Sequence, residues 1–166
     1  MDDRHALEAL VRYTNWANHE MVVACAPLSH EQLERVTMGT YGTLGQILVH
    51  LARAQGGYTR RLVGWEPTPA DDLPEDDPFP GVARIDAHLA MTGAMLAEAI
   101  GSLDLGRRIE VGGDEGRYEV EAWVILLQMS THATEHRQQI ATALTALGVP
   151  RPEPDLWAYW LSTARG

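Results

Sequence analysis

The stretch MSTHATEHRQQIATALTALG, residues 129–148, indicates a long helix that packs one side against other helices. His132 and His136 lie one turn apart on that same side, at about 100° per residue. Gly148 offers a C-terminal cap and Pro150 forbids continuation, so we predict a helix over 119–147. The apolar residues that share this face are Ile125, Met129, Ile140, Ala143 and Leu147.

Apolar residues at three- and four-residue steps predict three more long helices. Thr43 followed by Gln46 has the form of a capping box and opens one of them. Ser29 and Gln32 repeat that pattern in the connection before it, which predicts a short helical turn there. The three predicted helices span Asp3–Cys25, Thr43–Val63 and Val82–Leu103.

The connections complete the expected fold. Residues 65–81 are rich in proline and carboxylates, which predicts a long solvated crossover. Residues 107–123 contain two β-prone runs around glycines, so we expect a small β-hairpin or an extended loop. Leu156, Trp157, Trp160 and Leu161 share helical spacing and predict a short C-terminal helix. We predict an all-α four-helix bundle forming a single domain over residues 1–166.

Composition excludes several classes of protein. The 166 residues carry a formal net charge of -10, and every positive charge is an arginine, so nucleic acid is an unfavourable partner. Cys25 is the single cysteine, which excludes an internal disulfide and a CxxC motif. The first residues lack a signal-peptide pattern, and no apolar run is long enough to span a membrane. We expect a soluble, cytoplasmic protein without membrane contact.

The paired histidines define the candidate site. Two neutral imidazoles on a core-facing surface leave nitrogen lone pairs without a partner unless some other group binds them. A metal ion is one such partner, and a hydrogen bond to a neighbouring hydroxyl or backbone carbonyl is the other. His50 is the best-placed third ligand, because it lies at the edge of the apolar stripe of its helix, beside Gln46 and Gly57. Three neutral histidines would bind a borderline divalent ion and leave positions open for water or substrate.

A competing pattern uses the same residues. The run from His132 to His136 also reads H-x-x-E-H, the inverted zinc-peptidase motif in which the glutamate is the general base. That class needs an acidic ligand further along the chain, and only Glu153 and Asp155 follow, in a proline-flanked tail. Glu135 lies off the centre of the histidine face, where a solvated or supporting carboxylate is the default role.

Three segments resemble the DinB/YfiT-like superfamily of metal-binding four-helix bundles. They are LVRYTNWANHEMV, TLGQILVHLARAQ and HATEHRQQIATALTALGVPRPEPDL, in the order expected for the family. The family pattern of histidine, three residues, then His-Arg-Gly-Gln stands here with Gln138 in place of the glycine. The resemblance implies that His50, His132 and His136 hold a divalent transition metal, for which we expect nickel or zinc, with iron as an alternative.

The resemblance also implies a class of reaction, since characterised members of the family transfer low-molecular-weight thiols such as mycothiol or bacillithiol. We therefore expect a metal-dependent thiol S-transferase or hydrolase, acting on a small molecule in stress or detoxification. We further expect Gln46, Met129 and Gln139 to line the substrate pocket. The alternative is a non-catalytic stress-response module, with a structural or vestigial metal site, that serves binding or dimerisation.

A second apolar strip on the last long helix has two interpretations. It could be covered by the hairpin or the tail, or it could form a helix-to-helix dimer contact. The family resemblance favours a homodimer. The strip consists of Val120, Trp123, Val124 and Leu127.

Overall fold

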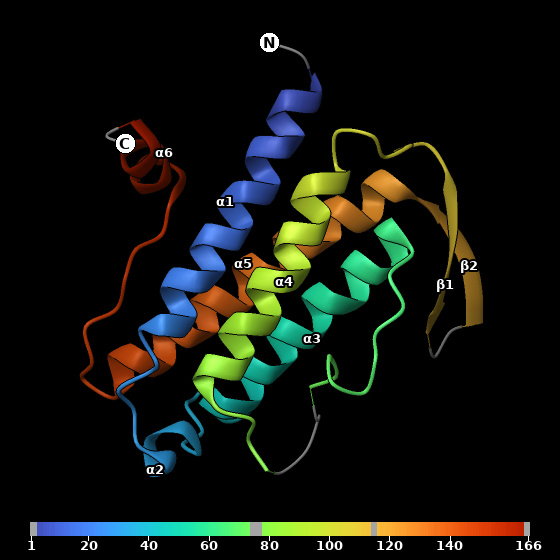
Figure 1. Cartoon of the computed structure of the whole chain (residues 1–166). Helices are drawn as coiled ribbons and strands as arrows, with labels where there is room; N and C mark the ends of the chain where they lie inside the picture. The colour runs from blue at the N-terminus through green and yellow to red at the C-terminus, as the bar shows by residue number, and fades with distance from the viewer. Residues whose placement is uncertain (1–2, 74–77, 114–115, 165–166) are drawn as a thin grey trace.

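Four long helices lie side by side as a bundle in the computed structural model, which describes residues 3–73, 78–113 and 116–164 (Figure 1). Two short helices and one hairpin accompany them. The long helices are α1 (Asp3–Val23), α3 (Leu44–Val63), α4 (Val82–Ala99) and α5 (Ala122–Ala146). The remaining elements are α2 (His30–Leu33), β1 (Arg108–Gly113), β2 (Gly116–Glu121) and α6 (Leu156–Ala164).

The long helices close into a ring, in which α1 contacts α4 and α5, and α3 contacts the same two helices. Helices α3 and α4 run in the same direction (Figure 1). Because they are consecutive and parallel, the chain between them must return along the length of the bundle. This is the long crossover that the proline-rich segment predicts, and the predicted four-helix bundle is confirmed.

Both predicted capping boxes are present. At the start of α3, the backbone N–H of Gln46 donates to Thr43 Oγ1, and the N–H of Thr43 donates to Gln46 Oε1. Ser29 and Gln32 make the same reciprocal pair at the start of α2. Gly64 ends α3 with a φ of 73°, a left-handed conformation that favours glycine.

Three predicted helix boundaries need correction. Helix α1 ends at Val23 and turns replace its expected last residues, while α4 ends at Ala99, short of the predicted Leu103. A helical pattern of side chains persists there, but Gly101 and the turn closed by Ser102 N–H on the Ala99 carbonyl stop the backbone. Helix α5 begins at Ala122 rather than near Glu119, because 119–121 pair with β1 as strand.

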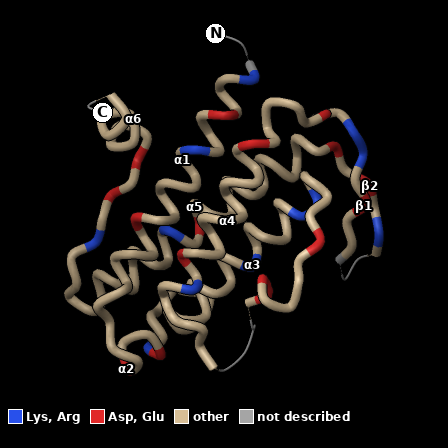
Figure 2. Tube along the Cα trace, viewed as in Figure 1, with Lys and Arg blue, Asp and Glu red and all other residues tan. Residues whose placement is uncertain are grey.

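The hairpin has one apolar and one charged face. Val111 pairs with Tyr118 and Ile109 with Val120 across the antiparallel strands, which places these four side chains on one face. The other face carries acidic residues and arginines, so both signs of charge lie along the strands (Figure 2). The half-buried Ile109, Val111 and Val120 pack against the core cluster at this end of the bundle.

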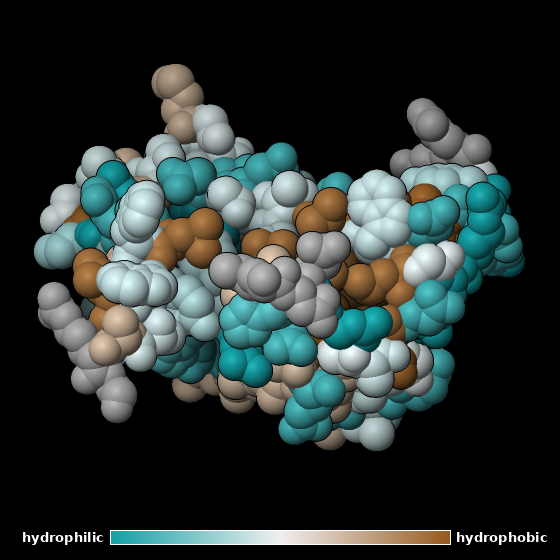
Figure 3. Space-filling view, turned by 90° about the horizontal axis from the view of Figure 1, so that it is seen from above, coloured by the Kyte–Doolittle hydropathy of each residue, from teal (hydrophilic) through white to brown (hydrophobic). Residues whose placement is uncertain are grey.

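Helix α6 packs on α1 and leaves its apolar residues at the surface. Tyr159 makes the contact, with its ring centroid 5.9 Å from that of Tyr13 and 5.4 Å from that of Trp16. Trp157 and Trp160 are 79% and 62% exposed. On the face viewed from above, apolar residues lie in patches separated by polar ones (Figure 3). Within the described ranges, no helix combines the length and apolar character needed to cross a membrane.

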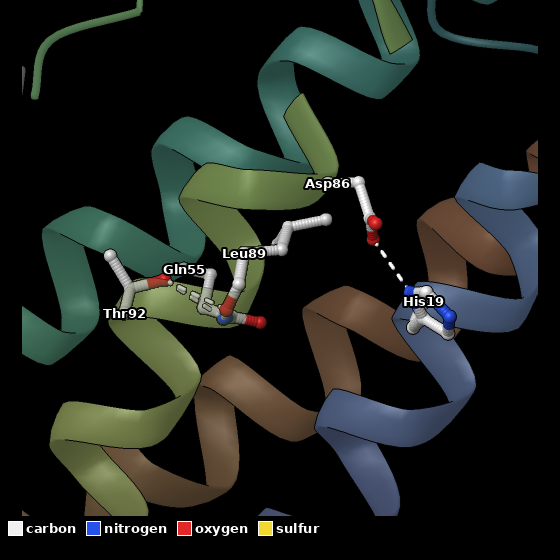
Figure 4. Close-up of polar contacts among 5 residues, drawn as sticks. All are labelled: His19, Gln55, Asp86, Leu89 and Thr92. Carbon is white, nitrogen blue, oxygen red and sulfur yellow. Dashed lines mark hydrogen bonds and ion pairs between the residues drawn. The ribbon is translucent and has the colours of Figure 1, made fainter. Parts of the chain in front are cut away.

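A buried chain of polar side chains crosses the bundle interior. Arg137 on α5 donates to Asn18 Oδ1 on α1 at 2.7 Å, and Asn18 Nδ2 donates to Gln55 Oε1 on α3 at 2.8 Å. Gln55 Nε2 then donates to the Leu89 carbonyl and to Thr92 Oγ1 on α4, as Figure 4 shows. The network therefore joins all four long helices. A separate surface contact, His19 to Asp86 at 2.8 Å, holds α1 to α4 nearby (Figure 4).

The guanidinium of Arg137 is buried, with 3% of the residue exposed. Burial lowers its pKa from the ordinary value, and the neighbouring Tyr13 opposes that shift. The guanidinium carbon lies 5.6 Å from the Tyr13 ring centroid, and a second guanidinium nitrogen donates to Thr134 Oγ1 at 2.8 Å. Neutral oxygens and an aromatic face thus stabilise this cation.

Replacing Asn18 with leucine tests the network. The Asn18→Leu side chain has a similar volume but leaves a buried Arg137 donor and the Gln55 Oε1 acceptor without their partner. We expect the free energy of unfolding to fall by about 2–4 kcal/mol, measured by urea denaturation followed by circular dichroism. The exposed Gln138→Ala, next to Arg137, should change it by less than about 0.5 kcal/mol. A loss for Asn18→Leu as small as the control's would contradict a stabilising role for the network.

Candidate metal centre

Three histidine side chains converge between α3 and α5. His50 Nε2 lies 3.1 Å from His132 Nε2, and His136 Nε2 lies 3.2 Å from the same nitrogen. The ligand atoms of all three lie within 4.8 Å of one another. The i to i+4 spacing on α5 brings the His132 and His136 rings to 4.4 Å between centroids, tilted by 60°, and the α3–α5 contact brings His50 opposite them. The structure therefore brings together the three residues that the sequence nominates.

The spacing fits a shared ion better than mutual hydrogen bonding. Two nitrogens, each about 2.1 Å from one ion and roughly 90–110° apart, lie about 3.0–3.4 Å from each other. A neutral imidazole nitrogen instead carries either one proton or one lone pair, so His132 Nε2 cannot make two good hydrogen bonds with two partners. The donor set of three imidazole nitrogens suits zinc, nickel or iron. The three residues therefore fit a divalent transition metal ion.

The environment favours the neutral form of His132 and His136. Burial, followed by the neighbouring His136 and His50, lowers the pKa of His132 to about 4. Burial and His50 also lower the pKa of His136, against smaller opposing effects of Gln139 and Glu135. Neutral rings at physiological pH present lone pairs, which is the form that binds metal.

Aromatic rings flank the three histidines on two sides. The Tyr41 ring centroid lies 4.8 Å from that of His50, and the Tyr58 ring meets His132 edge-on at 5.8 Å. Tyr41 belongs to the connection before α3, and its backbone N–H donates to Gln139 Oε1 at 3.1 Å. Gln139 lies on α5, one turn beyond His136 in the direction away from His132. The connection is thus tied to the same helix that carries His132 and His136.

An open cavity of about 710 Å³ adjoins the site between α3, α5 and the hairpin. His50 and His132 both line it, so two of the three histidines face its interior. Tyr58 and the apolar hairpin face contribute to its walls, while Gln128 adds an amide. The cavity gives a small molecule access to the histidine nitrogens.

The residues predicted for the substrate pocket lie in three different settings. Gln46 is exposed and its side-chain oxygen caps α3, and Met129 is 2% exposed inside the apolar core. Neither lines the cavity beside His50 and His132. Gln139 does adjoin the site, through His136 and Tyr41. A role in substrate binding stays a prediction for these three residues.

Sequence reasoning missed most of the cavity wall. Arg53, Tyr58 and Arg61 follow His50 at helical steps of three, eight and eleven residues, a spacing that could have identified them. Gln128 precedes His132 by one turn and carries the same signal. The hairpin residues carry no such signal, because their approach to α3 depends on tertiary packing.

The peptidase interpretation receives no geometric support. Glu135 is exposed, and the group of possible ligands found among the described residues holds three histidines with no carboxylate. Of that motif, the candidate site contains only the i to i+4 histidine pair.

Fold and site together define a class: a helical bundle with a candidate three-histidine metal centre between two of its helices. The chain belongs to the DinB family, whose sequence model matches residues 1–165. No curated protein and no solved structure is significantly similar to it.

The Gln139 contact predicts a local change in mobility. In Gln139→Ala the Tyr41 amide loses its acceptor, so we expect its hydrogen exchange to accelerate roughly tenfold, for a hydrogen bond of about 1–1.5 kcal/mol. Hydrogen–deuterium exchange with mass spectrometry measures this for the connection before α3. Gln138→Ala, at an exposed neighbouring position, is the control. Unchanged exchange in Gln139→Ala would show that this contact does not restrain the connection.

Proposed function

We propose that this protein is a metal-dependent enzyme in which the Nε2 atoms of His50, His132 and His136 bind one divalent transition metal ion, nickel or zinc, with iron as the alternative. The supporting observation is the convergence of three imidazoles, whose ligand nitrogens lie within 4.8 Å of one another, beside an open cavity. Three protein ligands leave coordination positions for water or substrate, which is the arrangement of catalytic rather than structural sites. The expected reaction is transfer of a low-molecular-weight thiol to an electrophile, in stress or detoxification.

The site's own residues support this chemistry by position. The Nε2 atoms of His50 and His136 both lie beside that of His132, and Tyr41 and Tyr58 cover two sides of the rings. When bound, the ion supplies the positive charge that lowers the pKa of a thiol or water. In the transfer, the thiolate sulfur forms a bond to an electrophilic carbon, the leaving group departs with its electron pair, and the thiol proton passes to solvent.

The chain's own thiol is unsuited to this role. Cys25 is fully buried in the apolar core, and burial raises its pKa to about 12. A buried thiol with a raised pKa is a poor nucleophile at neutral pH. This supports a small thiol as a separate cosubstrate.

The expected homodimer would use part of the predicted apolar strip. Trp123 and Leu127 on α5 are 46% and 41% exposed, whereas Val120 and Val124 line the cavity. A dimer contact through this strip would therefore involve the first pair, which the hairpin leaves open to solvent.

Metal content tests the proposed centre directly. We expect about one equivalent of transition metal in protein purified without chelator, and less than about 0.1 in His50→Ala and His132→Ala, because two imidazoles hold such an ion far more weakly than three. Elemental analysis by mass spectrometry measures it. His19→Gln, which removes a surface histidine bonded to Asp86, should retain the full equivalent. Wild-type protein that neither contains metal nor takes up nickel or zinc would refute the centre.

Thiol consumption tests the reaction. We expect the metal-loaded protein to consume mycothiol or bacillithiol with monochlorobimane at a rate that chelator reduces by at least roughly tenfold. His132→Ala should show the same loss. If no thiol is consumed while metal is bound, and no substrate analogue raises the melting temperature, the non-catalytic module becomes the better interpretation.

A further inference from the structure

The cavity beside the histidines has a charge that opposes the charge of the whole chain. The protein carries 23 acidic residues against 13 arginines, for a net charge of -10. Among the described residues that line this cavity, Arg53 and Arg61 are the only fully charged ones, and none is aspartate or glutamate. Figure 2 shows arginines at the end of α3 nearest the hairpin. A random sample of this surface would be acidic, so the local excess of positive charge points to an anionic ligand.

The α3 backbone aims one of these arginines toward the histidines. Arg61 Nη1 donates to the Gly57 carbonyl at 3.0 Å, which lays the guanidinium back along the helix by one turn, in the direction of His50. An added Cβ at Gly57 would lie 3.3 Å from that nitrogen, so the missing side chain leaves room for it. The remaining guanidinium donors are available to a ligand, since a planar guanidinium has five N–H groups.

Arg53 lies between Arg61 and His50 on the same face of α3. Its Nη1 donates to the Leu73 carbonyl, and the exposed Asp72 carboxylate lies 3.9 Å away, at the outer limit of an ion pair. Its side chain is 34% exposed. The contact with the crossover positions the guanidinium while leaving it at the cavity wall.

The opposite wall is apolar. Val111, Tyr118 and Val120 of the hairpin face the cavity from one side, and Val124 adds the first turn of α5. Hydrogen bonds at the base of the hairpin fix it in this position. Arg107 donates to the carbonyls of Arg61 and Leu62 at the end of α3, and the Ala122 N–H donates to the Arg107 carbonyl. The cavity thus has two cations on one wall, an apolar surface on the other, and the histidines at one end.

We propose that this cavity binds a small organic acid, with its anionic group on Arg61 and Arg53 and its apolar body against the hairpin. Arginine suits carboxylate, sulfonate and phosphate groups alike, because its N–H donors match two oxygens of such a group. That the acid is the substrate rests on the proposed function of the histidine centre. The binding itself does not depend on that function.

Two matched fluorescent probes test the proposal on the full chain. Anilinonaphthalene sulfonate and N-phenyl-naphthylamine share an apolar body, but only the first carries an anionic group. We expect Arg61→Gln to weaken binding of the sulfonate roughly tenfold, the loss typical of a charge-assisted hydrogen bond, and to change binding of the neutral probe by less than about twofold. Arg53→Gln should have the same effect, although it also removes the Leu73 contact.

Arg60→Gln is the control for overall charge. Arg60 is the adjacent residue on α3, is exposed, lies 3.4 Å from Glu66, and does not line this cavity. It should leave both affinities within about twofold of wild type. Equal losses in Arg60→Gln and Arg61→Gln, equal losses for both probes, or no binding of the sulfonate to wild-type protein would each overturn the proposal.

Competition identifies the anion, and metal content separates the two hypotheses. Phenylbutyrate should displace the sulfonate probe and phenylbutyramide should not, while displacement by phenyl phosphate alone would assign a phosphate ester in place of a carboxylate. Both arginine variants should keep the wild-type metal content, because neither side chain is a candidate ligand. Loss of probe selectivity with metal retained would reject the acid site alone, whereas absence of metal with selectivity retained would reject the metal centre alone.

Discussion

The hydrogen bonds from Arg137 through Asn18 to Gln55 are the constraint on which the bundle depends. A ring of four apolar helices can rotate or slide with small changes in buried area, but these side chains are satisfied in one relative placement only. Arg137 immediately follows His136, so fixing the rotation of α5 about its axis also fixes the direction of the histidine. Gln55 does the same for the helix that carries His50.

Two adjacent faces of α5 therefore pack in different environments. The face with His132 and His136 meets α3 and the cavity, while Arg137, about 100° further round the helix, meets α1. The two faces differ in whether their polar atoms have hydrogen-bond partners. Around Arg137 the polar atoms satisfy one another, whereas the histidine nitrogens converge without enough protons to do so. That contrast separates a stabilising polar network from a candidate ion site.

Local sequence signals predicted what depends on neighbouring residues. Capping boxes, helical periodicity and the i to i+4 histidine pair gave the helices, the starts of α2 and α3, and two of the candidate ligands. The end of α4 was misplaced because a glycine turn stops the helix, and the start of α5 was misplaced because the preceding residues pair with β1. Helix α6 was predicted from its spacing, yet its apolar residues remain exposed. The Arg137 network and the hairpin wall were missed, since both join segments distant in sequence.

The hairpin explains how one bundle can combine the proposed metal centre with the proposed ligand site. The three histidines lie at the α3–α5 interface, whereas the cavity shares Ile125, Val111 and Val120 with the core cluster at the hairpin end of the bundle. The two strands add a wall outside that interface, attached at the end of α3 and the start of α5. Changes in the strands' apolar face would therefore alter the shape of the cavity and the packing at this end of the bundle, while the histidines themselves lie on the helices. Under the two proposals, substrate selection falls to the hairpin and the α3 arginines, and metal binding to the histidines of α3 and α5.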